Sequence, residues 1–310
     1  MIPKVGIVGL GKMGENHARV LSRMDSVQLV GFYDPYPRKD TLPNIFFSSL
    51  EDLAEEIDYL IISSPTGSHV ENALFAADHG ITCLIEKPLA GSYEDAEKIR
   101  RAFEASGTPA AVGMVERFNI AASTARNLIA IGEIGEIQHI STTREGPFTG
   151  RIQDVGVGLD LASHDLDLIQ WITGQTISSI SLEKKSLHGG FEDYLVAIGK
   201  TEKQSSFSLS VNWRCPVKNR TVRIYGELGV MEVNLMEMTI RLDKSGNKAV
   251  AWEEMKQRFG EVVGDSFLIG LEKQEPLVLQ HAEIREFWIS GQSSLLCSLT
   301  EASFVVRLLE

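Results

Sequence analysis

Short apolar segments alternate with helical patterns over the first third of the chain. Runs of mostly apolar residues, typical of buried strands, occupy 4–9, 28–34, 58–63, 82–86 and 110–114. Between them, apolar residues recur at helical spacing over 13–24, 50–55, 70–79 and 93–105. This alternation is typical of a parallel sheet with helices on both faces. We therefore predict a doubly wound α/β domain over residues 1–119.

The pattern changes after residue 119. Helical spacing over 121–131 and 159–171 is followed by period-two segments at 177–187, 193–200, 206–213, 221–225, 229–233 and 239–242, and then by helical patterns at 279–290 and 299–309. We predict an α+β domain over 120–310, built on a largely antiparallel open sheet. Because apolar alternation in 206–213 and 221–225 indicates burial, we expect this sheet to join subunits in a homodimer or homotetramer.

The net charge, the apolar runs and the cysteines of the chain indicate which partners and which cellular compartment to expect. The formal net charge of −12 over 310 residues repels a phosphate backbone, which argues against nucleic acid. The first strand begins so early that we expect no signal peptide, and no apolar run is long enough to cross a bilayer. Cys83, Cys215 and Cys297 form no CxxC pair, which fits a reducing compartment. We expect a cytoplasmic protein without a membrane partner.

A glycine-rich turn follows the first predicted strand and opens a helix. It reads Gly9-Leu10-Gly11-Lys12-Met13-Gly14, in which the glycines permit a tight turn, approach of a pyrophosphate and close helix–strand packing. Asp34 ends the second strand 20 residues after Gly14, where a carboxylate binds the adenosine ribose hydroxyls. The pattern predicts a Rossmann domain that binds NAD, and Asp34 disfavours the 2′-phosphate of NADP. The alternative is a plain glycine turn followed by a helix-capping Asp.

Polar residues also follow the third and fourth predicted strands. Ligands of open α/β sheets bind beyond the carboxyl ends of the strands, so we expect cofactor contacts there. The residues concerned are Ser64, Pro65, Thr66 and His69 after one strand and Glu86 and Lys87 after the next. Lys87 would bind a substrate oxygen or move a proton beside the nicotinamide. The alternatives are helix-start residues for Thr66 and His69 and a solvated surface charge for Lys87.

Asp160 and His164 lie four residues apart at the start of a predicted helix, so they share one helix face. A carboxylate beside an imidazole fixes its tautomer and raises its basicity, which suits deprotonation of an alcohol during hydride transfer. We expect no metal, since no further His or Cys cluster completes a site. The alternative is a capping Asp with a partly buried His.

Taken together, these motifs resemble the Gfo/Idh/MocA family of NAD(P)-dependent oxidoreductases. The matching features are the glycine turn, Asp34, Glu86-Lys87-Pro88 and Asp160-x-x-x-His164-Asp165, which span both halves of the chain. The resemblance implies a Rossmann domain followed by an α/β domain whose open sheet often supports oligomerisation. It also implies that Lys87 and His164 are catalytic, with Asp160 as a partner, in a dehydrogenase acting on a carbohydrate-type alcohol.

Three segments, 115–119, 144–148 and 151–158, resemble the UDP-N-acetylglucosamine 3-dehydrogenase branch of this family, although Ile120 stands where that branch has proline. The expected substrate is therefore a sugar or sugar nucleotide oxidised at a secondary alcohol, lying between the strand ends of the first domain and the sheet of the second. The expected substrate-binding residues are Lys87, Arg117, Asn119, Arg144, Arg151, Asp160 and His164. Arg144 and Arg151 could instead pair with surface acids. The alternative functions are a dehydrogenase of a free polyol such as an inositol, and a nicotinamide-binding regulatory protein without turnover.

Overall fold

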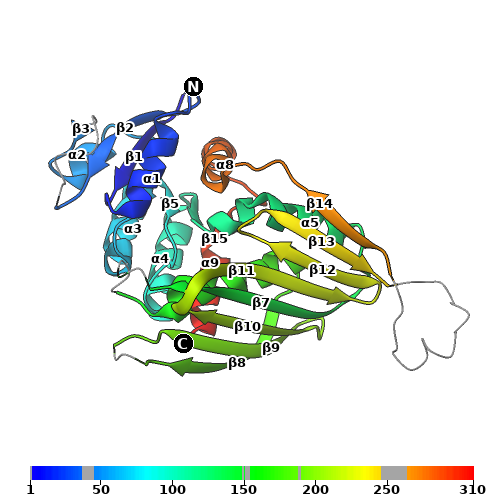
Figure 1. Ribbon diagram of the computed structural model, residues 1–310. Helices are drawn as coiled ribbons and strands as arrows, with labels where there is room; N and C mark the ends of the chain where they lie inside the picture. Colours follow the sequence, from blue (N-terminus) through cyan, green and yellow to red (C-terminus); the bar gives the residue numbers. More distant parts are fainter. Residues whose placement is uncertain (1, 37–44, 149, 151–153, 188–189, 246–263) are drawn as a thin grey trace, which may run out of the picture. The chain divides into compact units, whose positions relative to one another are not determined.

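The computed structural model describes residues 2–36, 45–148, 150, 154–187, 190–245 and 264–310 (Figure 1). The chain divides into two compact units. The first comprises Met1–Phe118, Thr149–Asp167 and Gln274–Glu310, and the second comprises Asn119–Phe148 and Leu168–Lys273. The boundary expected near residue 119 coincides with the first crossing between the units. Two later segments return to the first unit, which the sequence analysis did not anticipate.

The sheet of the first unit has the strand order of a doubly wound fold. Its strands are β1 (Lys4–Val8), β2 (Gln28–Tyr33), β3 (Ile45–Phe46), β4 (Tyr59–Ile62), β5 (Thr82–Ile85), β6 (Ala110–Val112) and β15 (Cys297–Ser298). They lie in the order β15-β6-β5-β4-β1-β2-β3, and every neighbouring pair is parallel except β15 with β6. The predicted parallel sheet is confirmed. The order reverses between β1 and β4, where such sheets bind ligands.

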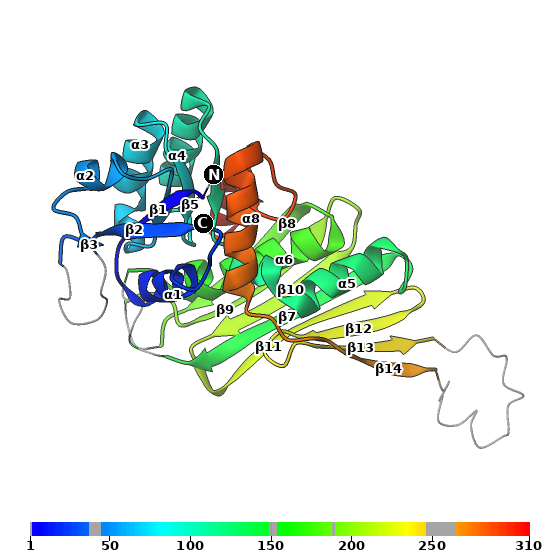
Figure 2. The same cartoon turned by 90° about the horizontal axis from the view of Figure 1, so that it is seen from above.

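Helices cover both faces of this sheet because its strands are apolar on both sides. On β4, Leu60 and Ile62 pack in one core cluster with residues of α2 (Leu50–Ala54), α3 (His69–Asp78), α4 (Tyr93–Ser106) and α9 (Leu299–Leu308). Tyr59 and Ile61 pack in the other with residues of α1 (Lys12–Leu21) and α8 (Pro276–Ser290). Figure 2 shows α3 and α4 on one side of the sheet and α1 on the other. Since α8 and α9 contribute to the two clusters, the C-terminal segment belongs to this unit.

The second unit is built on one large sheet. Its strands are β7 (Ile137–Pro147), β8 (Ile177–Lys185), β9 (Tyr194–Thr201), β10 (Ser206–Asn212), β11 (Arg214–Gly226), β12 (Gly229–Asn234), β13 (Thr239–Lys244) and β14 (Ser266–Gly270). The order is β14-β13-β12-β11-β7-β10-β9-β8, visible in Figure 1. Neighbouring strands are antiparallel except β7 with β10, which confirms the largely antiparallel sheet. Helix α5 (Ile120–Ala130) packs against β12 and β13.

Strand β7 lies in the middle of this sheet, yet the hydrophobic pattern did not predict it. Its buried face carries Thr142, Arg144 and Gly146 as well as two isoleucines, so the apolar alternation is interrupted by polar residues. The pattern also missed the short strands β3 and β15, and β14. Strands of this kind are recognised only once their neighbours in the sheet are known.

The two faces of this sheet differ in polarity. Leu209 of β10 and Val222 of β11 flank Thr142 on the buried face. The apolar residues that alternate along β10 and β11 are therefore buried within this unit. On the opposite face, one row across the sheet is mostly polar and includes two exposed apolar residues, Ile198 and Leu268. The row consists of Ser181, Ile198, Ser208, Ser141, Arg223, Glu232, Arg241 and Leu268. The apolar alternation is therefore no evidence for a subunit interface, and the oligomer stays a prediction.

None of the helices in the described part of the chain has the length and apolarity that crossing a membrane requires.

Candidate functional site

The glycine turn between β1 and α1 leaves room for a ligand at one of its three glycines. Gly9 has a φ of +88°, and a Cβ there would lie 2.4 Å from the backbone nitrogen of Ser64. A Cβ on Gly14 would lie 2.1 Å from the carbonyl oxygen of Gly9. Gly9 and Gly14 are therefore glycines because the neighbouring backbone leaves no space for a side chain. A Cβ on Gly11, in contrast, would have no neighbour within 4 Å among the described residues. Gly11 is also the N-cap of α1 and supplies no side chain to bond its first N–H groups, so the turn fits a pyrophosphate.

The Asp34 carboxylate lies against this turn. Its Oδ2 accepts a hydrogen bond from the backbone N–H of Leu10 at 2.7 Å, and its Oδ1 accepts one from the N–H of Tyr36 at 2.8 Å. Each carboxylate oxygen can accept further hydrogen bonds, so Asp34 retains the capacity to bind ribose hydroxyls. Of the other turn residues, Lys12 is exposed and lies 3.6 Å from Glu15, and Met13 is half-buried.

The loops after β4 and β5 are joined by a buried histidine. His69 Nε2 lies 2.9 Å from the carbonyl oxygen of Ser64, and its Nδ1 lies 3.0 Å from that of Pro88. Burial lowers the pKa of His69, although the three carbonyl groups around the ring act in the opposite direction. His69 therefore braces the two loops in which we predict cofactor contacts. Pro65 is exposed, and Thr66 donates its backbone N–H to the Asp154 carboxylate at 3.0 Å.

Lys87 and Asp160 form an ion pair that the spacing of the sequence did not predict. The Lys87 Nζ donates to the Asp160 carboxylate at 2.8 Å and to the Asp160 carbonyl at 3.0 Å. The side chains of Lys87 and Asp160 are 17% and 8% exposed, so the pair is shielded from water. An ammonium has three N–H groups, which leaves one for a further acceptor. Only Glu86 separates Lys87 from the end of β5, at the edge of the sheet where the glycine turn also lies.

The segment that carries Asp160 is not a regular α-helix. Gly158–Ala162 forms a π-helical turn, and α6 (Ser163–Thr173) continues from it. Such turns occur frequently at functional sites. His164 follows in the first turn of α6 and is half-buried. The prediction that Asp160 orients His164 stays a prediction, while the contact with Lys87 gives Asp160 a second role.

The remaining expected substrate residues have structural roles or lie outside the described residues. Arg117 is 4% exposed and binds Asp167 through Nε at 2.9 Å and Glu301 through a terminal nitrogen at 3.0 Å. Asn119 caps α5 by accepting from the Ala121 N–H and donates to the Leu235 carbonyl. Arg144 is buried in β7. Arg151 lies outside the described residues. We therefore leave Arg117 and Asn119 out of the substrate site proposed below.

Sequence reasoning missed a chain of buried side chains behind Glu86. His17 Nε2 lies 2.9 Å from Glu86 Oε1, and His17 Nδ1 lies 2.9 Å from His281 Nε2. Both imidazoles are fully buried. Burial, and then the neighbouring His17, hold the pKa of His281 well below its ordinary value. His17 and His281 are far apart in the sequence, and no local pattern joins them.

The buried His281 predicts a dependence of stability on pH. In the folded protein His281 stays neutral, whereas in the unfolded chain it binds a proton as the pH falls below about 6.5. The unfolded state then binds more protons, so acidification lowers the free energy of unfolding by at most about 1.4 kcal/mol per pH unit for each such histidine. His69, whose pKa is also lowered, contributes in the same direction. Urea unfolding between pH 7.5 and about 5.5 measures this slope.

The matched variants for this measurement are His281→Gln and His79→Gln. The first removes one of the two buried titrations and is expected to flatten the slope, whatever it does to the absolute stability. The second replaces an exposed histidine and is expected to leave the slope unchanged. An equal slope in His281→Gln and the wild type would contradict the assignment.

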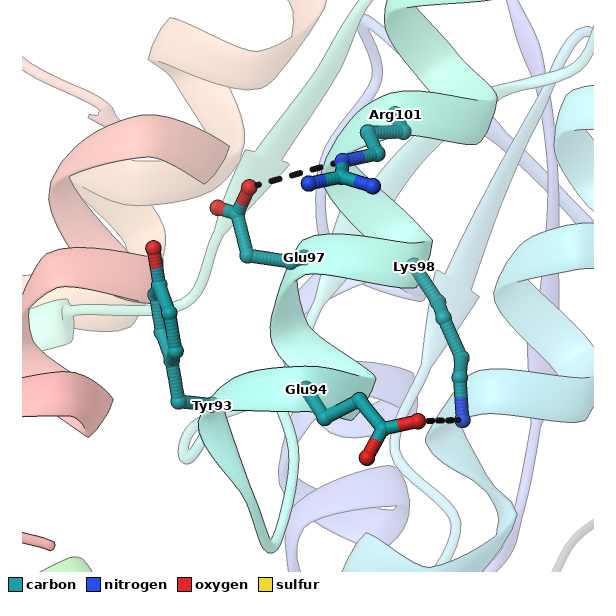
Figure 3. Close-up of a pocket in the computed structure, with 5 residues that line it drawn as sticks. All are labelled: Tyr93, Glu94, Glu97, Lys98 and Arg101. Atoms are coloured by element: carbon teal, nitrogen blue, oxygen red, sulfur yellow. Dashed lines mark ion pairs between the residues drawn. The ribbon is translucent and has the colours of Figure 1, made fainter.

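A surface hollow of about 350 Å³ lies along α4 (Figure 3). It is lined by Tyr93, Glu94, Glu97, Lys98 and Arg101. Lys98 pairs with Glu94 at 3.1 Å, and Arg101 pairs with Glu97 at 3.7 Å, so the charges satisfy one another. It contains none of the expected site residues and gives no functional indication. Within the described ranges, no group of three or more His, Cys, Asp or Glu side chains is arranged to hold a metal ion.

Comparison with protein-family models matches both halves of the chain. Residues 3–114 match the Gfo/Idh/MocA model, described as an oxidoreductase family with an NAD-binding Rossmann fold. Residues 122–232 match the model of the Gfo/Idh/MocA C-terminal domain. Together the two matches include the glycine turn, Asp34, Lys87, Asp160 and His164.

Similar proteins include two named dehydrogenases. UDP-N-acetylglucosamine 3-dehydrogenase of Acidithiobacillus ferrooxidans is 30% identical over 176 residues, which cover 55% of this chain and 54% of that enzyme. The NAD(+)-dependent scyllo-inositol 2-dehydrogenase of Bacillus subtilis is 28% identical over 203 residues, covering 61% and 59% respectively. The alignments thus span little more than half of these relatives. A solved structure of the A. ferrooxidans enzyme superposes with a TM-score of 0.86 at 21% identity, covering 100% of this chain and 96% of that one.

Proposed function

Since the chain belongs to the Gfo/Idh/MocA family of oxidoreductases, we propose that it oxidises a secondary alcohol of a sugar or polyol with NAD as the hydride acceptor. The observation that carries the proposal is the shielded pair of Lys87 and Asp160, which lies at the strand edge that also bears the glycine turn. Two acceptors of Asp160 hold the Lys87 amine at this edge, where it could donate a hydrogen bond to the oxygen of a bound alcohol.

The residues of the turn fit the cofactor. Gly11 and the first N–H groups of α1 would hold the pyrophosphate, and Asp34 would bind the adenosine ribose. Ser64, Pro65, Thr66 and Glu86 would contact the rest of the dinucleotide, with His69 bracing their loops. When bound, NAD supplies the carbon that accepts the hydride.

Residues of the chain would accept the proton that the substrate hydroxyl loses. Lys87 would donate its remaining N–H to the reacting oxygen and stabilise the negative charge that develops there. His164 would accept the hydroxyl proton, directly or as part of a coupled unit with Lys87. Asp160 holds the Lys87 ammonium in place through two hydrogen bonds, so its carboxylate also sets the charge around the reacting oxygen.

We further propose a UDP-N-acetylglucosamine-like substrate, oxidised at C3. The support is the 30% identity with an enzyme of that name and the resemblance of three segments to its branch. A sugar nucleotide brings a diphosphate into an acidic protein, so its binding needs local cations. Arg144 and Arg151 are the cations that we propose, both from their positions in the sequence.

The test is a panel of alcohols assayed for NAD reduction by absorbance of the reduced nicotinamide. The panel contains UDP-N-acetylglucosamine, UDP-glucose, free N-acetylglucosamine, myo-inositol and scyllo-inositol. We expect turnover of a UDP sugar and competition by uridine diphosphate. Turnover of an inositol without competition by uridine diphosphate would replace the sugar-nucleotide proposal with the free-polyol alternative. NAD binding without turnover of any alcohol would favour a regulatory protein.

Asp34 is expected to set the cofactor preference. Asp34→Ser removes both a ribose contact and the charge that repels a 2′-phosphate. We therefore expect weaker NAD binding and relatively stronger NADP binding, measured by titration calorimetry. Because Asp34 also accepts from Leu10, Asp34→Asn is the matched control, since it keeps an acceptor oxygen without the charge. A wild-type protein that already prefers NADP would show that Asp34 does not have this role.

A further inference from the structure

Three buried ionisable side chains from separate parts of the first unit form a continuous chain that ends beside Lys87. His281 lies on α8, His17 on α1 and Glu86 directly after β5. The two contacts along the chain are each 2.9 Å long, and Glu86 is 5% exposed. A buried carboxylate is stable only when hydrogen bonds replace its hydration, so these contacts have a large effect on Glu86.

The contacts determine where the protons lie. His281 Nδ1 has no hydrogen-bond partner within the described part of the chain, so a proton there would be buried without an acceptor. The neutral His281 ring therefore carries its proton on Nε2 and donates it to His17 Nδ1. His17 must then carry its own proton on Nε2, from which it donates to Glu86 Oε1. Both tautomers follow from the hydrogen-bond network.

Glu86 is confined on its other sides as well. A Cβ on Gly113 would lie 2.8 Å from Glu86 Oε1, so a side chain at this position would displace the carboxylate from its present place. Glu86 Oε2 accepts from the backbone N–H of Lys87 at 3.3 Å. The carboxylate thus joins the ring of His17 to the peptide of Lys87.

We propose that His17 is a positioning residue that acts through Glu86 on Lys87, with His281 selecting the tautomer of His17. The inference rests on the function proposed for Lys87. The donor on His17 holds one oxygen of Glu86, and the other oxygen holds the Lys87 peptide at the end of β5. Because the backbone of Lys87 is fixed in this way, its side-chain amine is held within reach of both acceptors of Asp160.

The first test measures the Lys87 amine without requiring turnover. The NAD-free protein is treated with a limiting amount of acetic anhydride, and acetylation of Lys87 is quantified by mass spectrometry against the exposed Lys98. His17→Leu removes the donor and is expected to raise acetylation of Lys87 several-fold, because the pair with Asp160 loosens. His17→Gln places an amide N–H near the original Nε2 and is expected to restore slow acetylation. Equal acetylation in the wild type and His17→Leu would overturn the proposal.

The second test asks whether His17 acts through Glu86. We expect His17→Leu to lower kcat about tenfold, the scale of coupling within one hydrogen-bond network, with little change in the KM for the alcohol. Adding His17→Leu to Glu86→Ala is expected to cause no further loss of kcat. Losses that multiply instead would show that His17 acts by packing alone. If His17→Leu does not fold, His281→Leu replaces it, with the same direction of effect and a smaller size.

The two tests separate this inference from the proposed function. A protein that turns over none of the tested alcohols would contradict the function, and the acetylation of Lys87 would still report on His17. A protein that turns over a sugar, with acetylation and kcat unaffected by His17→Leu, would contradict the inference alone.

Discussion

Replacing Lys87 with alanine is expected to lower kcat about a hundredfold or more, the usual scale for the loss of a positioned acid–base group. The variant removes the N–H that would bind the reacting oxygen and leaves the Asp160 carboxylate without its cation. NAD affinity should change little, since the glycine turn and Asp34 account for most of it. Steady-state kinetics with the best alcohol of the panel, together with NAD titration, measure both quantities.

Two further variants make this measurement specific. Lys98→Ala removes an exposed lysine that pairs with Glu94 and Asp95 on α4, and it should leave kcat unchanged. Asp160→Asn keeps an oxygen near the Lys87 amine but removes the charge, so its loss of kcat should be smaller than that of Lys87→Ala. Near-normal turnover in Lys87→Ala would refute the proposed role of the pair.

Gly11→Val is expected to abolish measurable NAD binding while the protein stays folded. The added side chain would meet no protein atom at its Cβ, so the turn can keep its shape. The valine would instead occupy the space that a pyrophosphate needs beside the first N–H groups of α1. Titration calorimetry with NAD and the thermal midpoint of unfolding test the two halves of this expectation separately.

Other glycines provide the controls for this variant. Gly91→Val adds a side chain at an exposed position where a Cβ also has open space, and both NAD binding and stability should persist. Gly14→Ala forces a Cβ against the Gly9 carbonyl and should lower the thermal midpoint. If Gly11→Val binds NAD with wild-type affinity, the turn does not hold the pyrophosphate.

The first unit could be predicted from the sequence because its signals are local. Its central strands β1, β4 and β5 are buried along almost their whole length and so read as short apolar runs, and the helices between the strands have their own periodicity. The second unit was predicted in outline only. Its middle strand, β7, buries Thr142 and Arg144, whose polarity hides the alternation until the neighbouring strands are known.

The candidate site shows the same division between local and distant signals. Gly11, Asp34 and Lys87 each lie within three residues of the end of a strand, so their positions at the sheet edge could be predicted from the sequence. The pairing of Lys87 with Asp160 depends on a π-helical turn far along the chain, which no helical spacing predicts. A motif predicts that Arg117 binds substrate, and the structure shows ion pairs of Arg117 with Asp167 and Glu301, which no local pattern predicts.

The return of residues 274–310 to the first unit has a consequence for synthesis of the protein. Both faces of the nucleotide-binding sheet need apolar side chains from this last segment, such as Ile284 and Phe287 on one face and Leu299 and Val306 on the other. A nascent chain that has emerged only as far as residue 118 therefore exposes part of each core to solvent. Although domains generally fold in order during translation, this one can complete its core only after residues 274–310 have emerged from the ribosome.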